Sequence, residues 1–218
     1  MSTYAVSELV KEVKVLLDRN QETSGLLTPT DTDTLSQGEL IQSKIVDAAR
    51  IILKDAPASM LDGKTFNELN TAWAESNGAY VGTVYLPSDM IRLLNVKASD
   101  WNRSAEIITE EDDAYKIQCN RFGVRGNPER PIAALIHNSG NRYLELFTSK
   151  SNTATVSLTY VGMPSISEGN IDLPETLKDS IVYMAGYLTC ISLGDTDTAS
   201  GLLGVARKLA HIVEPTTS

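Results

Sequence analysis

The spacing of apolar residues changes twice along this chain, and this change constrains the fold more than any other feature. At both ends, apolar residues recur every three or four positions, which is typical of amphipathic helices. Between about residues 64 and 172, short runs of Val, Ile, Thr and Tyr alternate with Gly, Pro and Asn, which is typical of strands and turns. The sequence therefore predicts helices at both ends of the chain and a β region between them.

Local signals set the expected boundaries of these elements. Ser36 and Glu39 form a capping-box pattern, and Pro174 suits the first position of a helix. Thr109 followed by Asp112 predicts a short helix inside the β region. Long helices are expected over residues 6–17, 36–56, 174–193 and 195–212, and the clearest strands over residues 79–86, 91–98, 131–137, 142–148 and 153–161.

The apolar faces of the four long helices predict how these elements pack. Each face is too apolar to remain in water, so the N-terminal pair is expected to pack against the C-terminal pair. The predicted fold class is α+β, a four-helix bundle formed by the N- and C-terminal helix pairs with an inserted antiparallel β domain. The bundle is expected to comprise residues 1–58 and 173–214, the β domain residues 59–172, and a short C-terminal tail residues 215–218.

Composition excludes several classes of protein. The chain has 218 residues, of which 42% are hydrophobic and 22% charged, so it can bury a core without disulfides. Its formal net charge of −9 disfavours general electrostatic binding to DNA. Charged residues near the N-terminus exclude a signal peptide, and the longest apolar run is too short to span a membrane, so we expect a cytosolic protein with no membrane role.

The sequence offers little reactive chemistry. Only two histidines, His137 and His211, are present, and the cysteines Cys119 and Cys190 match no metal-binding or redox spacing. No nucleophile elbow, Walker phosphate loop or dinucleotide-binding glycine pattern occurs. We therefore expect no enzyme, and no catalytic, cofactor-binding or metal-binding residues.

Paired aspartates form the first candidate for a ligand site. Asp31 and Asp33 lie in an Asp-Thr-Asp-Thr segment that recurs at residues 195–198, and alternate aspartates can begin a calcium loop. Neither copy supplies the glycine and glutamate that complete such a loop, so helix capping is the favoured interpretation. The acidic run at residues 110–113 is similarly interpreted as the start of a helix rather than a cation site.

Three arginines and two tryptophans are the other candidate contact residues. Arg121, Arg125 and Arg130 lie in a glycine-containing segment that could bind a phosphate or the carboxylates of a partner. The alternative is a wide loop whose arginines pair with the nearby carboxylates of residues 112 and 129. Trp73 and Trp101 are expected to be core or interface anchors, because no repeated aromatic spacing accompanies them.

The order of several short segments resembles one family. These segments are residues 47–55 (DAARIILKD), residues 85–96 (YLPSDMIRLLNV), Asp100-Trp101, Gly126-Asn127-Pro128 with Arg130-Pro131, and Leu173-Pro174-Glu175 at the start of a helix hairpin. Together they resemble the head-to-tail adaptor, connector or ring proteins of short-tailed bacteriophages, and among these the ring proteins of crAss-like phages.

The resemblance implies a structural virion protein. Such a protein forms a homo-oligomeric ring of about twelve copies, a dodecamer, below the portal, and the ring continues the DNA channel towards the tail. Its partners would be the portal protein and downstream tail or ring proteins, and DNA would pass without specific binding during genome ejection. The protein would lie in the portal-tail region of the virion after assembly in the host cytoplasm, and Asp31 and Asp33 would lie in a loop that contacts a neighbour.

Two other functions stay open from the sequence. A small-ligand or glycan-binding module could use the β region, with Trp73, Trp101 and the arginine segment as contacts. A metal-assisted hydrolase could use Asp31, Asp33 and the acidic run at residues 110–113, but no His or Cys ligand accompanies them.

Overall fold

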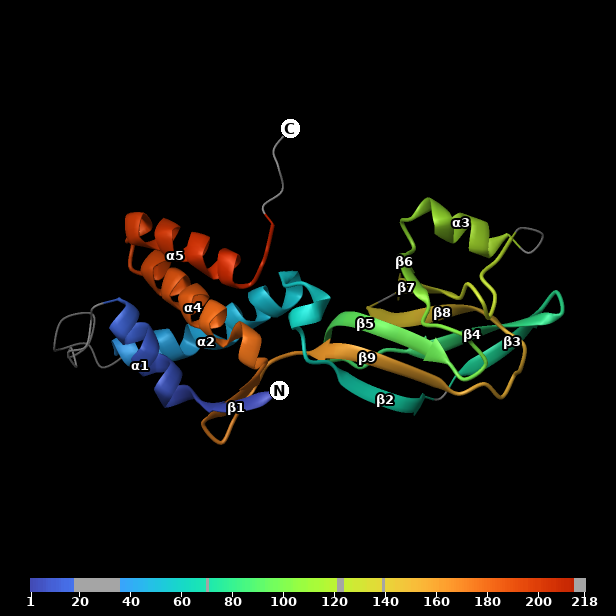
Figure 1. Ribbon diagram of the computed structural model, residues 1–218, viewed down its shortest axis with the longest axis horizontal. Coiled ribbons are helices and arrows are strands. Elements are labelled where there is room, and N and C mark those ends of the chain that lie inside the picture. Colours follow the sequence, from blue (N-terminus) through green and yellow to red (C-terminus); the bar gives the residue numbers. More distant parts are fainter. Residues whose placement is uncertain (18–35, 70, 121–123, 139, 214–218) are drawn as a thin grey trace. The chain divides into compact units, whose positions relative to one another are not determined.

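The chain divides into two compact units, which are described separately (Figure 1). The computed structural model describes residues 1–17, 36–69, 71–120, 124–138 and 140–213. The helical unit comprises Met1–Asp62 and Met163–Ser218, and the β unit comprises Gly63–Gly162. The helical unit is therefore built from both ends of the chain.

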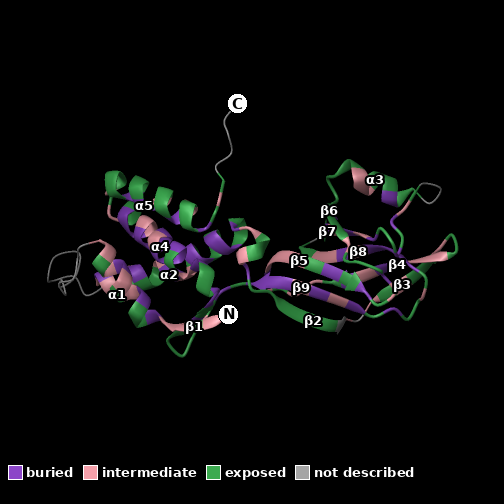
Figure 2. Cartoon of the chain, viewed as in Figure 1, coloured by how far each residue is buried: buried purple, intermediate pink, exposed green. Residues whose placement is uncertain are grey.

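Helix α4 is the central element of the helical unit. It packs against α1, α2 and α5, and its buried residues lie on several sides of the helix (Figure 2). Gly186 of α4 is buried, and a Cβ there would lie 3.1 Å from Leu16 of α1 and 3.4 Å from Leu202 of α5. The helices are α1 (Val6–Leu16), α2 (Gln37–Asp55), α4 (Lys178–Ser192) and α5 (Thr196–Leu209), with 3₁₀ turns η1 (Ala58–Met60) and η2 (Glu175–Leu177).

The helix starts follow the predicted capping chemistry. At α2, the Glu39 amide donates to Ser36 Oγ at 3.3 Å and the Ser36 amide donates to Glu39 Oε2 at 2.7 Å. Hydrogen bonds to its carboxylate from the Ser36 side chain and from the Ser36 amide lower the pKa of Glu39. At α5, the Thr198 amide donates to the Asp195 carboxylate, and Gly194 ends α4 with a φ of +79°. The capping box and the second helix predicted from Ser36 are confirmed.

The helical unit also contains a small antiparallel sheet. Its strands are β1 (Ser2–Ala5), β11 (Asn170–Leu173) and β10 (Ile166–Ser167), in the order β1-β11-β10. Ser2 lies opposite Leu173 and Ala5 opposite Asn170, and the Thr3 hydroxyl donates to Asp172 at 2.6 Å. This pairing joins the first residues of the chain to the segment that precedes α4.

The β unit consists of two sheets. The three-stranded sheet has the order β2-β9-β5 and is antiparallel, whereas the five-stranded sheet has the order β3-β4-β8-β7-β6 and includes the parallel pair β6 and β7. Its elements are β2 (Lys64–Leu69), β3 (Ala72–Ser76), β4 (Ala79–Tyr85), β5 (Met90–Ala98), β6 (Glu106–Thr109), α3 (Asp113–Cys119), β7 (Ile132–Asn138), β8 (Asn141–Ser149) and β9 (Val156–Gly162).

Alternating side chains produce a core between the two sheets. Val156, Leu158 and Tyr160 of β9 are buried, and the same cluster contains Leu144 and Leu146 of β8. The other face of the five-stranded sheet carries a second cluster, against which α3 packs through Ala114 and Tyr115. The short helix predicted after Thr109 is thus present as α3, and it covers part of that face (Figure 1).

The predicted fold class, a four-helix bundle with an inserted antiparallel β domain, is wrong. The described residues form five α-helices and eleven strands in three sheets, so the fold is a β-rich α+β arrangement. One sheet belongs to the helical unit, and one sheet of the β unit contains a parallel pair. The prediction failed because helical spacing reports only local order, whereas β1 pairs with a strand more than 160 residues away.

Candidate functional site

Both tryptophans pack in the β unit. Trp101 is 2% exposed, and its indole Nε1 donates to the Thr148 carbonyl at 3.0 Å. Trp73 of β3 is half-buried, and its Nε1 donates to the Ala154 carbonyl at 2.9 Å. The Trp73 ring lies against Gly82 of β4, where a Cβ would lie 2.7 Å from the ring. These contacts use the aromatic faces and the indole donors inside the fold, so neither ring is a free stacking surface.

Backbone hydrogen bonds of Gly126 fix the position of the arginine segment. The Gly126 amide donates to Gln118 Oε1 at 2.7 Å, and the Gly126 carbonyl accepts from Thr148 Oγ1 at 2.9 Å. Thr148 thereby links the segment to Trp101. Arg125 Nη1 donates to Ser76 Oγ at 2.8 Å, so its described partner is a β3 hydroxyl and not the carboxylate of residue 112 or 129.

Of the remaining predicted contact residues, Arg130 alone lies among the described residues. Arg130 is exposed and lies in a tight turn in which Asn127 Oδ1 accepts from the amides of Glu129 and Arg130. Arg121 lies outside the described residues, and so do Asp31 and Asp33. The structure therefore brings Trp101 and Arg125 together through Thr148 and Gly126, and it places Trp73 on the same strand as the Ser76 that binds Arg125.

The acidic run begins α3, as its position predicted. Asp112 Oδ2 accepts from the Thr109 amide at 2.7 Å and from the Thr109 hydroxyl at 3.0 Å, and these hydrogen bonds lower the pKa of Asp112. Asp113 forms an ion pair with Lys116 at 2.7 Å. Glu110 and Glu111 are exposed and form no ion pair with the described residues.

Two tyrosines on this side of the five-stranded sheet have perturbed pKa values. Tyr115 of α3 donates to Glu145 Oε2 at 2.9 Å, and burial followed by hydrogen bonding raises the pKa of Tyr115. Burial, Glu145 and Glu110 raise the pKa of Tyr143. The phenol of Tyr115 is thus held in its protonated form as a hydrogen-bond donor to Glu145.

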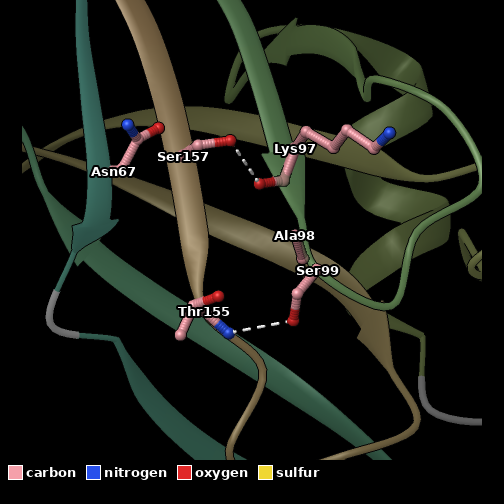
Figure 3. Close-up of a pocket in the computed structure, with 6 residues that line it drawn as sticks. All are labelled: Asn67, Lys97, Ala98, Ser99, Thr155 and Ser157. Carbon is pink, nitrogen blue, oxygen red and sulfur yellow. Dashed lines mark hydrogen bonds between the residues drawn. The ribbon is translucent and has the colours of Figure 1, made fainter.

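A polar depression of about 390 Å³ lies on the three-stranded sheet (Figure 3). Ser157 Oγ donates to the Lys97 carbonyl at 3.2 Å, and the Thr155 amide donates to Ser99 Oγ at 3.1 Å. Figure 3 shows the Lys97 side chain extending away from the other labelled side chains. The depression presents hydroxyls and the Asn67 amide, which suit hydrogen bonding to a polar surface.

A second depression, of about 380 Å³, lies in the helical unit between α2 and α4. It is lined by Lys44, Asp47, Arg50, Ile51 and Lys54 of α2 and by Leu188 of α4. We call this feature the basic groove. Sequence analysis did not single it out, although the spacing of Lys44, Asp47, Ile51 and Lys54 places them near one another on a helix.

The described residues contain neither a cluster of metal-binding side chains nor a helix that could span a membrane. No group of three or more His, Cys, Asp or Glu side chains in the described ranges could hold a metal ion. None of the helices in the part of the chain that the structure describes is long and apolar enough to cross a membrane. The depressions and the exposed side chains around them are therefore the candidate functional features.

Comparison with known proteins adds no assignment. No protein-family model matches the chain, and no curated protein matches its sequence. The functional interpretation accordingly depends on the geometry of the two units and on the order of sequence segments.

Proposed function

We propose that this chain is a structural virion protein, a head-tail adaptor whose copies form a ring below the portal of a short-tailed bacteriophage. In this role the ring continues the DNA channel and docks the tail or a further ring. The protein acts by binding other polypeptides and carries no reaction centre. Its copies and its portal and tail partners are assembled in the host cytoplasm.

The observation that carries the proposal is the organisation of the chain into two units. A helical unit made from both chain ends and a β unit inserted between them offer surfaces for contacts between neighbouring copies and for contacts with the proteins above and below the ring. The side chains of Trp101, Arg125 and Thr148 form hydrogen bonds inside the fold. This favours a protein that binds partners through extended surfaces over one that binds a small ligand in a pocket.

The charge of the chain supports the passage of DNA without binding. Each copy carries a formal charge of −9, so a ring of copies repels the phosphate backbone wherever acidic side chains face the channel. Repulsion lets DNA slide during ejection and does not arrest it. The proposal therefore expects weak binding to duplex DNA that does not depend on sequence.

The glycan-binding alternative has less support. The two tryptophans on which this alternative depends do not offer a free face to a sugar ring, because Trp101 is 2% exposed and Trp73 packs against Gly82. The polar depression on the three-stranded sheet offers hydrogen bonds without such a surface. We therefore retain the adaptor as the single proposed function.

Native mass spectrometry tests the proposal. The purified chain is measured alone, with the portal protein encoded by the same genome, and with the neighbouring tail proteins. We expect a closed ring of defined copy number on the portal, whether or not the chain forms a ring alone. A chain that binds neither the portal nor any tail protein would overturn the proposal.

A further inference from the structure

The basic groove contrasts with the acidic character of the chain. The whole sequence has 28 acidic and 19 basic residues, yet the groove is lined by three cations and one carboxylate, Asp47. Between them lie Ile51, which is 38% exposed, and Leu188. A groove lined by cationic and apolar side chains suits a protein segment that carries both carboxylates and apolar side chains.

Two of the three cations are available to a partner. Lys44 and Arg50 form no ion pair with the described residues, although Asp47 lies one helical turn from each. Both side chains extend from α2, whose packing against α4 fixes the groove. The helix backbone that carries these charges is therefore already in place before a partner binds.

The β unit of the same chain carries a complementary segment. Its acidic turn, which we define as residues 110–113, follows β6, ends at the first residue of α3 and contains four carboxylates and no cation. Asp112 accepts a hydrogen bond from Thr109, and Asp113 forms an ion pair with Lys116. Glu110 and Glu111 are exposed and have no ion pair among the described residues. Ile107 and Ile117, on either side of the turn, are 36% and 52% exposed.

We infer that the basic groove of one copy binds the acidic turn of a second copy. Lys44 and Arg50 would receive Glu110 and Glu111, while exposed isoleucines on the two sides provide apolar contact. The two surfaces differ, so the contact is heterologous, and repetition of such a contact around an axis closes a ring. This inference rests on the proposed function and specifies the contact between neighbouring copies.

Chemical cross-linking of the wild-type chain gives the first test. A carbodiimide joins amines to carboxylates only when they are in contact, and an equimolar mixture of ¹⁴N- and ¹⁵N-labelled chains distinguishes links between copies from links within one copy. We expect mixed-isotope links from Lys44 or Lys54 to residues 110–113, and their yield should fall as salt rises. A map without such links between copies would overturn the inference.

Charge reversal gives the second test. The variant Lys44→Glu/Arg50→Glu and the variant Glu110→Lys/Glu111→Lys should each raise the dissociation constant between copies by roughly tenfold or more. An equimolar mixture should restore association, because both contacts between unlike copies are complementary: the reversed groove meets the reversed turn, and the unchanged groove meets the unchanged turn. Lys208→Glu and Glu129→Lys, at exposed positions outside both surfaces, are matched controls and should leave association unchanged. Circular dichroism checks that every variant is folded.

The outcomes separate this inference from the proposed function. Wild-type rings that assemble on the portal, with both reversal variants assembling equally well, would overturn the groove contact and leave the adaptor role intact. Failure of the wild-type chain to assemble alone or on the portal would overturn both. Loss of duplex DNA binding in Lys44→Glu/Arg50→Glu, with unchanged association between copies, would identify the groove as a DNA contact and overturn the inference.

Discussion

Substitution of Gly126 by alanine should destabilise the β unit strongly. Gly126 is buried, and a Cβ at this position would lie 2.6 Å from the Phe147 carbonyl oxygen and 3.0 Å from the Ile132 amide nitrogen. Ordinary contact begins near 3.4 Å, so the segment and strand β8 must separate by about 0.8 Å. The first obstacle is backbone of a central strand, which cannot move aside as a flexible side chain can.

The magnitude follows from two contributions. Overpacking of this kind costs about 1–3 kcal/mol. Movement of Gly126 also weakens its hydrogen bonds with Gln118 and Thr148, each of which contributes about 1 kcal/mol. We therefore expect Gly126→Ala to reduce the free energy of unfolding by about 2–4 kcal/mol.

Tryptophan fluorescence during urea unfolding measures the stability of the β unit specifically. The chain has two tryptophans, and both lie in the β unit, so their emission follows that unit and not the helices. Gly204→Ala is the matched control, because Gly204 lies exposed in α5 and a Cβ there would meet nothing within 4 Å. The control should stabilise the helical unit by about 0.5–1 kcal/mol and leave the fluorescence transition in place. A Gly126→Ala transition within about 0.5 kcal/mol of wild type would refute the reasoning.

Three further substitutions test other contacts. Ser36→Ala removes the capping box of α2 and should cost about 1 kcal/mol in the helical unit, measured by thermal unfolding followed by circular dichroism. Burial and the hydrogen bond to Asp89 raise the pKa of Tyr160 to about 12, so the stability that this phenol provides is complete below about pH 10 and is lost as pH rises through 12. Tyr160→Phe should therefore be about 1 kcal/mol less stable at pH 7 but lose less stability than wild type above pH 10, by fluorescence-monitored urea unfolding. The hydrogen bond to Glu12 raises the pKa of Lys178. The stability that this ion pair provides is therefore complete below about pH 10.4, the pKa of the unfolded chain, and is lost as pH rises through the higher pKa of the folded state. Lys178→Met should make the helical unit less sensitive to alkali, as measured by circular dichroism at pH 8 and pH 11.5.

Elements with a strong local signal could be predicted from the sequence. Ser36 and Glu39 cap α2 as expected, and the alternation of Val156, Leu158 and Tyr160 identified a strand that the structure buries between two sheets. These signals work because capping and side-chain alternation depend on neighbours only a few residues away.

Features that depend on distant residues could not be predicted. The residues of β1 adjoin α1 without a turn, and only pairing with β11 makes them a strand. The parallel pairing of β6 with β7 similarly follows from topology and not from either strand alone. At the candidate sites, the contact of Arg125 with Ser76 and the position of Leu188 beside α2 arise when segments far apart in the chain come together.

The construction of the helical unit from both chain ends has a consequence for synthesis. Helices α1 and α2 emerge from the ribosome before α4, against which both pack, because the whole of Gly63–Gly162 lies between them in the chain. At about 5–20 residues per second, those intervening residues delay the partner by roughly 5–20 s. During that interval α1 and α2 have only each other as native helical partners, so the faces that α4 later covers are expected to be the segments that chaperones occupy. The β unit, whose strands pair among themselves, can complete its fold first.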